Sequence, residues 1–251
     1  MRKIFNCIMD IGEQMLICGA EVHRVEDSIN RMCAAFGAER SDVFIITSSM
    51  VVTVYLPDES VYTQTRRIKG IGTDIEKLHG LNRLSREICS EKLTPEQIRS
   101  EFREILNLRS YPLWVECIAY MAVAAAFAVF FGGGLSDAAV ALVIGCIVRF
   151  IVLIADKASM NKIFTKFLCS FAVSSLALVG MKLGFIDSID KAVIGNIMLL
   201  IPGVGLTNGL RDLFAGDSIA GLLRLIEAVL TALAIAAGYF LFVVTMGGAL
   251  K

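Results

Sequence analysis

Charged residues are scarce in this sequence. Asp, Glu, Lys and Arg make up only 19% of its 251 residues, whereas 56% are hydrophobic and the mean hydropathy is +0.69. A soluble domain needs a charged outer shell, which this composition cannot supply. The sequence therefore predicts a membrane protein.

Neither sign of charge is in excess. There are 15 Lys and Arg against 16 Asp and Glu before Pro112, and 9 against 8 after it. Nucleic-acid binding needs a basic surface, so we expect no nucleic-acid partner. The uneven distribution of charge predicts a soluble α+β domain over residues 1–112 and a membrane domain over residues 113–251.

Cysteine and histidine lack the spacing of metal or catalytic sites. The seven cysteines contain no Cys-x-x-Cys pair, and their odd number favours a reducing compartment. His23 and His79 have no partner four residues away. A glycine-flanked serine elbow and a phosphate-binding glycine loop with its lysine are both missing. We therefore expect no metal, no cofactor, no catalytic residue and no enzymatic activity.

The first domain shows no export signal. Its initial apolar run is interrupted by Asn6, Asp10 and Glu13, too early for the hydrophobic segment of a signal peptide. We expect this domain in the cytoplasm. Apolar spacing and turn residues predict its elements in the order α-β-β-β-α-α. These are a long helix over Ile4–Phe36, strands over Val43–Ile46, Val51–Tyr55 and Val61–Thr65, a helix with a Thr73–Glu76 capping box, and a helix from Pro95 to about Leu108.

The membrane domain contains apolar runs close to the roughly 20 residues that span a bilayer. They predict five transmembrane helices, the fourth broken at Pro202-Gly203: residues 113–131, 138–155, 163–181, 192–201 and 222–244. With the first domain in the cytoplasm, five crossings place the C-terminus outside. The loop Lys and Arg residues favour the same orientation weakly.

Ionisable residues within the predicted spans are costly and need an explanation. Glu116 and Arg149 lie near span ends, where snorkelling toward water could accommodate either. Arg224 and Glu227 are three residues apart, which favours an ion pair along the helix. Glu116 and Glu227 are the protonatable candidates for ion coupling, with Arg224 tuning Glu227.

The break after the fourth span is the strongest candidate for a substrate site. Pro202 and Gly203 interrupt helical hydrogen bonding, and transporters place substrates at such broken helices. The polar residues that follow, Asn208, Arg211, Asp212 and Asp217, could bind a small carboxylate or zwitterion. An ordinary turn, with Asp217 capping the next helix, is the structural alternative.

A second polar segment lies in the first domain. Arg24 is three residues from both Glu21 and Asp27, which predicts ion pairs along a solvated helix face.

The chain resembles the threonine/serine exporter family in three blocks. Pro202-Gly203, Asn208, Arg211-Asp212, Gly216-Asp217, Gly221, Arg224 and Glu227 resemble its membrane signature. Gly19 with His23-Arg24-Val25-Glu26, and Leu81-Asn82-Arg83-Leu84-Ser85-Arg86, resemble its cytoplasmic domain.

The five predicted spans make the chain similar to the larger subunit of the split, YjjP-like branch of that family. This resemblance implies export of threonine/serine or of a succinate-like dicarboxylate across a bacterial inner membrane. It also implies a smaller five-span partner, with a homo-oligomer as a further possibility, and gives Gly19, Arg24 and Glu26 as a motif of the cytoplasmic domain. A membrane-anchored enzyme and a regulatory subunit acting through the first domain are the alternatives.

Overall fold

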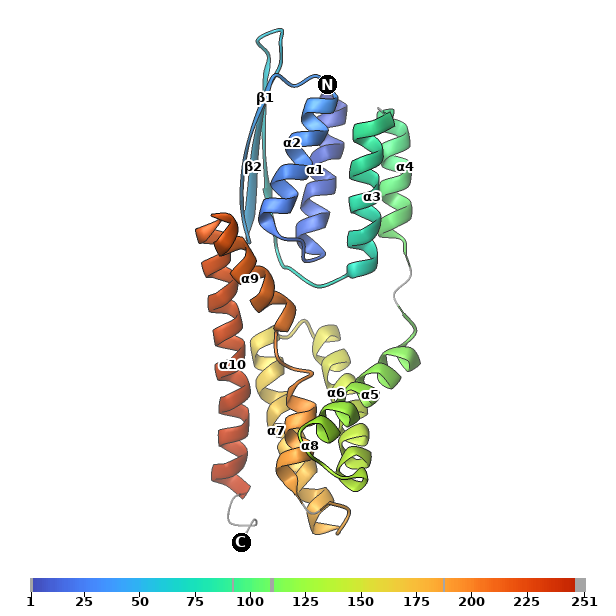
Figure 1. Cartoon of the computed structure of the whole chain (residues 1–251), viewed down its shortest axis with the longest axis vertical. Helices are drawn as coiled ribbons and strands as arrows, with labels where there is room; N and C mark the ends of the chain where they lie inside the picture. Colours follow the sequence, from blue (N-terminus) through green and yellow to red (C-terminus); the bar gives the residue numbers. More distant parts are fainter. Residues whose placement is uncertain (1, 92, 109–110, 187, 247–251) are drawn as a thin grey trace. The chain divides into compact units, whose positions relative to one another are not determined.

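The structure is a computed structural model that describes residues 2–91, 93–108, 111–186 and 188–246. It divides into two compact units. The first contains a β-sheet, four helices that precede residue 109, α9 (Gly203–Ala215) and the start of α10 (Ser218–Met246) up to Ile226. The second contains the other helices and α10 from Glu227 onward (Figure 1).

The first unit has the predicted α+β composition. Its three strands form an antiparallel sheet in the order β1-β2-β3, and each covers a predicted strand. The elements are α1 (Arg2–Ile17), α2 (Val22–Ala35), β1 (Arg40–Ile46), β2 (Ser49–Tyr55), β3 (Val61–Arg67), α3 (Ile75–Glu91) and α4 (Pro95–Leu106).

Helices α1 and α2 cover one face of the sheet, and α3 and α4 pack on their other side (Figure 1). Alternate side chains of β2, those of Met50, Val52 and Val54, are fully buried, because successive residues of a strand point to opposite faces. They join the inner sides of α1 and α2 in one hydrophobic core.

The prediction of one helix over Ile4–Phe36 is wrong, because α1 ends at Ile17 and α2 begins at Val22. Gly19 has a φ of 93°, a left-handed conformation that favours glycine. The amide of Gly19 donates to Leu16 O, and that of Ala20 to Met15 O, which is the Schellman pattern of a helix end. The apolar spacing continues across this turn because both helices bury a face in the same core.

Different residues cap the N-termini of α3 and α4. The predicted Thr73 cap of α3 is wrong by one residue, since Asp74 Oδ1 accepts the Lys77 amide at 3.0 Å. For α4 the prediction of Pro95 in the first turn is confirmed, and Thr94 and Gln97 form a capping box.

The second unit contains α5 (Leu113–Phe130), α6 (Leu135–Lys157), α7 (Lys162–Lys182) and α8 (Ile189–Ile197). Four helices of the described chain, α5, α6, α7 and α10, are long and apolar enough to cross a membrane. An interruption lies where the sequence predicts it, but it begins earlier than Pro202, because α8 ends at Ile197 and α9 begins at Gly203. Alone, the nine residues of α8 extend about 14 Å, less than half of a hydrocarbon core of roughly 30 Å.

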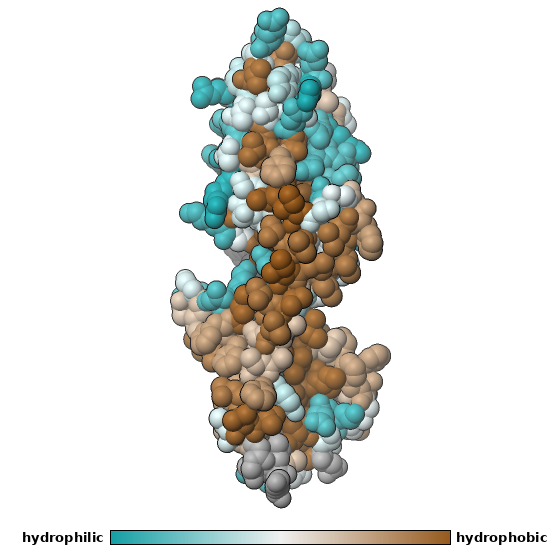
Figure 2. Space-filling model, turned by 90° about the vertical axis from the view of Figure 1, so that its left-hand side faces the viewer, coloured by the Kyte–Doolittle hydropathy of each residue, from teal (hydrophilic) through white to brown (hydrophobic). Residues whose placement is uncertain are grey.

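Small side chains and a few polar contacts hold the second unit together. Ala124, Ala128 and Ala141 are fully buried between its helices. The Asn196 amide donates to Ala141 O at 3.1 Å, and Ser170 Oγ donates to Ile235 O at 2.7 Å. Close packing of small residues and such interhelical hydrogen bonds are typical of membrane helices. Figure 2 shows that hydrophobic residues cover most of the visible surface of this unit.

Candidate functional site

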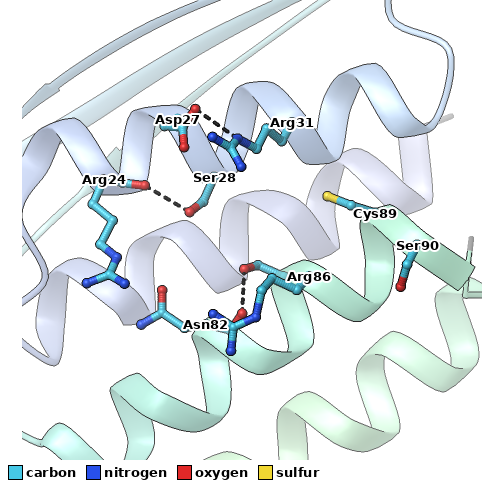
Figure 3. A pocket seen from close by; sticks show the side chains of 9 residues that line it. Arg24, Asp27, Ser28, Arg31, Asn82, Arg86, Cys89 and Ser90 are labelled. Carbon is cyan, nitrogen blue, oxygen red and sulfur yellow. Dashed lines mark hydrogen bonds and ion pairs between the residues drawn. The ribbon is translucent and has the colours of Figure 1, made fainter.

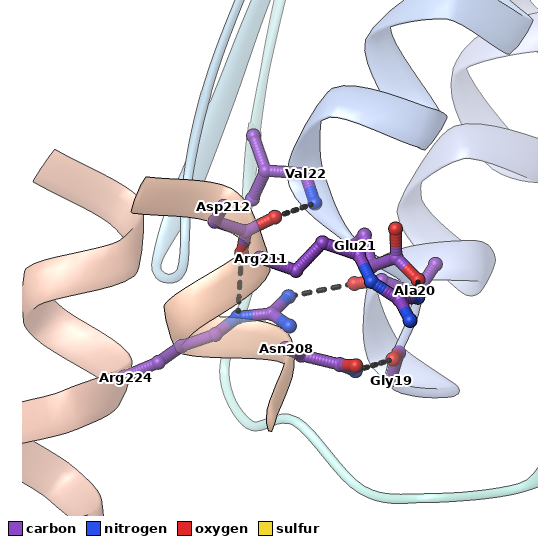
Figure 4. Close-up of polar contacts among 8 residues, drawn as sticks. All are labelled: Gly19, Ala20, Glu21, Val22, Asn208, Arg211, Asp212 and Arg224. Carbon is purple, nitrogen blue, oxygen red and sulfur yellow. Dashed lines mark hydrogen bonds and ion pairs between the residues drawn. The ribbon is translucent and has the colours of Figure 1, made fainter. Parts of the chain in front are cut away.

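Three of the predicted substrate residues meet the turn between α1 and α2 within the first unit. We call this group the α9 cluster (Figure 4). It consists of Gly19, Ala20, Glu21 and Val22 from the turn, Asn208, Arg211 and Asp212 from α9, and Arg224 from α10.

Two members of the cluster bind carbonyl groups of the turn. Asn208 Nδ2 donates to Gly19 O at 3.0 Å, and the Arg224 guanidinium donates to Ala20 O at 2.6 Å. The end of a helix leaves carbonyl oxygens without intrahelical partners, and burial without a partner would be costly. The side chains of α9 and α10 therefore complete the backbone hydrogen bonding of the turn.

Asp212 caps α2 from a distant part of the chain. Its Oδ1 accepts the amide of Val22, the first residue of α2, at 3.1 Å. Glu21, which occupies the N-cap position, forms no side-chain cap bond. A carboxylate at a helix N-terminus is favourable because the free amides and the helix dipole are positive there.

Arg224 lies beside Asp212 in the interior of the first unit. Its Nε is 3.4 Å from Asp212 Oδ2, an ion pair without hydrogen-bond geometry, and the two side chains are 6% and 1% exposed. Burial raises the pKa of Asp212, and the positive charge of Arg224 opposes that rise. The pair joins α9 to α10.

A close approach of α9 and α10 makes this geometry possible. A Cβ added to Gly221 would lie 2.7 Å from Gly209 O and 2.8 Å from the Leu213 amide nitrogen. Real side chains cannot approach backbone atoms so closely, which explains why the chain has glycine at this position.

Arg211 differs from the other charged members of the cluster because it faces solvent. It forms an ion pair with Glu21, and the side chains of Arg211 and Glu21 are 60% and 20% exposed. A guanidinium group presents five N–H donors in one plane, enough to hold two carboxylate oxygens. Arg211 is thus the cationic group of the cluster that a dissolved carboxylate can reach.

The remaining predicted substrate residues lie at or next to the ends of α9 in the chain. Pro202 and Gly203 lie at the break between α8 and α9, and a Cβ at Gly203 would meet no atom within 4 Å. Asp217 directly precedes α10, and its carbonyl accepts the Gly221 amide. This is the helix-cap position that the structural alternative placed there.

Glu26 of the predicted cytoplasmic motif lies on α2 and contacts the sheet. Its Oε1 accepts the Ile45 amide at 3.1 Å, which ties α2 to β1. Burial raises the pKa of Glu26 to about 7, and the negative charge of Asp217 acts in the same direction. His23 and the Ile45 amide oppose the rise, whereas Asp212 adds to it.

Two ionisable residues of the second unit, Glu116 and Arg149, form an ion pair that the sequence did not predict. Arg149 of α6 donates from Nε to Glu116 Oε2 of α5 at 2.8 Å, and its guanidinium lies 5.9 Å from the centre of the Tyr120 ring. Arg224, by contrast, is engaged with Asp212 rather than with the expected Glu227, whose side chain is exposed.

Sequence reasoning missed Glu21 as the partner of Arg211 and Arg149 as the partner of Glu116. The first two are 190 residues apart in the chain, and the second two are 33 apart. Helical spacing reports only neighbours three or four residues away, so it carries no signal for either pair.

One protein family matches almost the whole chain, including the sheet, the α8–α9 break and the α9 cluster. The model of the family described as "Putative threonine/serine exporter" matches residues 6–246. The chain belongs to this family. The prediction of the family is confirmed, and the protein is a multi-pass membrane protein of a transporter family.

Individual relatives are distant but match along the whole chain. The "Probable succinate transporter subunit YjjP" of Klebsiella aerogenes is 25% identical over 94% of this chain and 92% of its own length. The protein of the same name in Escherichia coli K12 is 23% identical with the same coverage. "Pheromone-regulated membrane protein 10" of Kluyveromyces lactis is 23% identical over 97% of this chain, which spans only 25% of that longer protein. No solved structure matches.

Proposed function

We propose that this chain is the larger subunit of a secondary transporter that exports a small carboxylate from the cytoplasm across a bacterial inner membrane. The substrate is threonine/serine or a succinate-like dicarboxylate. The observation that carries the proposal is the family match over residues 6–246, which includes both compact units. The two YjjP relatives, which cover the same chain, are named as succinate transporter subunits.

The proposed crossing pattern is five, with α8 and the turn after it as the broken fourth span. The contacts of α9 support this pattern. Asn208 and Asp212 bind the turn between α1 and α2, so α9 and the first domain lie on the same side of the membrane. Three crossings by α5, α6 and α7 end on the opposite side, and the chain must return before α9 begins.

The proposed substrate group is Arg211, which would exchange the Glu21 carboxylate for a carboxylate of the substrate. Both ligands offer carboxylate oxygens to the guanidinium group, and Arg211 is exposed enough to meet a dissolved anion. Asn208 and Asp212 hold α9 against the turn and thereby position Arg211. In this proposal Pro202 and Gly203 shape the break between α8 and α9, and Asp217 shapes the turn between α9 and α10.

Glu116 and Glu227 are the proposed groups for ion coupling. Protonation of Glu116 would remove its charge and release Arg149, which offers a two-state element between α5 and α6. Glu227 is exposed on α10, three residues beyond the Arg224 that binds Asp212.

The word "subunit" in the names of the YjjP relatives implies a second chain. We propose a smaller five-span membrane partner, with homo-oligomers of this chain as an additional level of assembly. Freed backbone at the α8–α9 break needs cover by protein within a membrane, which a partner would supply.

Efflux of labelled serine, threonine and succinate from proteoliposomes tests the proposal, with the chain alone and with its partner. Arg211→Lys keeps the charge but loses the fork, so export should fall at least about tenfold while the protein still inserts. Arg40→Lys is the matched control, since Arg40 also pairs with an acid on the surface of the first unit. Parent-like export by both Arg211→Lys and Arg211→Ala would place the substrate elsewhere.

Glu116→Gln separates coupling from binding in the same assay. We expect exchange of substrate across the bilayer to persist while accumulation against a gradient is lost. Full accumulation by Glu116→Gln and by Glu227→Gln would exclude both residues from coupling.

A further inference from the structure

A polar pocket lies between α2 and α3 in the first unit, apart from the α9 cluster. Its volume is about 380 Å³ (Figure 3). Two segments that the sequence analysis singled out, residues 19–26 and 81–86, meet in it. The side chains that matter here are Arg24, Asp27 and Arg31 of α2 and Asn82, Ser85 and Arg86 of α3.

The pocket is positively charged. Three guanidinium groups and one carboxylate line it. The carboxylate, that of Asp27, already pairs with Arg31 at 3.0 Å. Arg24 and Arg86 form no ion pair with any residue that the structure describes. The sequence prediction that Arg24 pairs with Glu21 or Asp27 is therefore wrong, because Glu21 binds Arg211 and Asp27 binds Arg31.

The neutral residues of the pocket do not supply the missing partner. Ser28 Oγ donates to Arg24 O, Ser85 Oγ to Asn82 O, and Asn82 Nδ2 to Leu78 O. Each of these donors is used within its own helix. Arg24 and Arg86 are thus the two arginines of the pocket without an acidic partner among the described residues.

Two guanidinium groups without acidic partners line one cavity, and this arrangement is suited to binding an anion between them. Guanidinium binds the oxygens of carboxylate or phosphate through paired N–H donors. We propose that this pocket binds a small dianion, a dicarboxylate or a phosphate, between Arg24 and Arg86. The site lies outside the proposed transport route and makes the first unit a ligand-binding module.

Isothermal titration calorimetry on the full chain in detergent tests this inference. The probes are succinate, inorganic phosphate and the uncharged succinamide. We expect saturable binding of at least one dianion with a Kd of about 1 mM or tighter, weakened by added salt, and no binding of succinamide. Succinate and phosphate binding, compared side by side, identify which oxyanion the site prefers.

Substitutions locate the binding. Arg24→Gln and Arg86→Gln should each weaken it at least about tenfold. Arg83→Gln is the matched control, because Arg83 lies on the same helix but pairs with Glu87 outside the pocket, and it should bind like the parent. Arg211→Lys should leave phosphate binding to this pocket unchanged, whereas the proposed transport site takes a carboxylate, so phosphate separates the two sites.

Two results would overturn the inference. One is the lack of saturable binding of either dianion to the parent chain. The other is unchanged binding by Arg24→Gln and Arg86→Gln, whose thermal stability without ligand should match the parent because neither side chain has an ion-pair partner to lose. Neither result depends on whether the chain transports anything.

Discussion

The guanidinium of Arg224 lies 3.4 Å from the carboxylate of Asp212, and both side chains are almost completely buried. They join α10, a candidate membrane span, to α9 and through it to the turn between α1 and α2. A buried pair of this kind contributes little net stability compared with apolar packing, but the loss of one partner leaves a buried charge uncompensated. The pair therefore couples the turn between α1 and α2 to the first residues of α10.

Asp212→Asn should destabilise the first unit by about 3–5 kcal/mol, because it leaves Arg224 without its counter-charge. The measurement is thermal unfolding of the purified chain. Its readout is the reaction of the thiols of Cys7, Cys18 and Cys33, which are buried in the folded chain, with a fluorogenic reagent. Asp42→Asn is the control. It removes an exposed ion pair with Arg40, and should change stability by about 1 kcal/mol or less. Equal effects of the two substitutions would contradict the prediction.

Gly19→Ala should also destabilise the first unit, by more than Gly37→Ala. Both glycines have positive φ, 93° and 85°, so both substitutions carry a left-handed strain of about 1–2 kcal/mol. Only at Gly19 would the new Cβ collide with backbone, 2.6 Å from Gly72 O, whereas Gly37 has open space around it. The same thiol-reactivity assay compares the two variants, and the difference between them isolates the collision from the strain. Similar melting temperatures would show that the turn can move aside.

Local patterns in the sequence predicted most of the first unit and the break of the fourth helix. The three strands follow β-branched runs, and the helix is interrupted as predicted, although α8 already ends at Ile197, before Pro202. The turn at Gly19 was missed because apolar spacing continues through it, which a periodicity argument cannot distinguish from one long helix. A glycine required by positive φ leaves no mark on hydrophobic spacing.

The candidate site shows the limit of local reasoning. The sequence predicted Asn208, Arg211 and Asp212 as a polar group, and the structure places all three together. Their partners are backbone atoms and Glu21 in the turn after α1, about 190 residues earlier in the chain. Contacts at that separation depend on tertiary folding, so no spacing rule can provide them.

Glu26 should make the first unit less stable as the pH rises. Its pKa is raised to about 7 in the folded chain from 4.5, so between these values the folded state holds a proton that the unfolded state has lost. Stability from this group is thus present at pH 4.5 and is lost as the pH rises through 7. Glu26→Gln keeps an oxygen for the Ile45 amide without the charge, and should stabilise the unit at pH 8 by about 1–2 kcal/mol after allowance for solvent screening.

Melting temperatures at pH 5 and pH 8 provide the measurement for Glu26. The parent and Glu26→Gln should coincide more closely at pH 5 than at pH 8. Glu39→Gln, on an exposed residue of the same unit, controls for loss of a surface charge. A gap between parent and Glu26→Gln that is the same at both pH values would refute the assignment of a raised pKa.

Cysteine labelling in intact cells tests the five-span arrangement. Ser136, at the start of α6, should lie outside, whereas Ser159, between α6 and α7, and Thr207, on α9, should lie in the cytoplasm. All three are exposed, and the parent chain is the blank because its seven cysteines are buried or half-buried. An impermeant thiol reagent should then label Ser136→Cys alone, and cell lysis should expose the other two. Labelling of Thr207→Cys in intact cells would mean that α8 does not return the chain to the cytoplasm. It would also exclude the proposed entry of substrate at Arg211 from the cytoplasm.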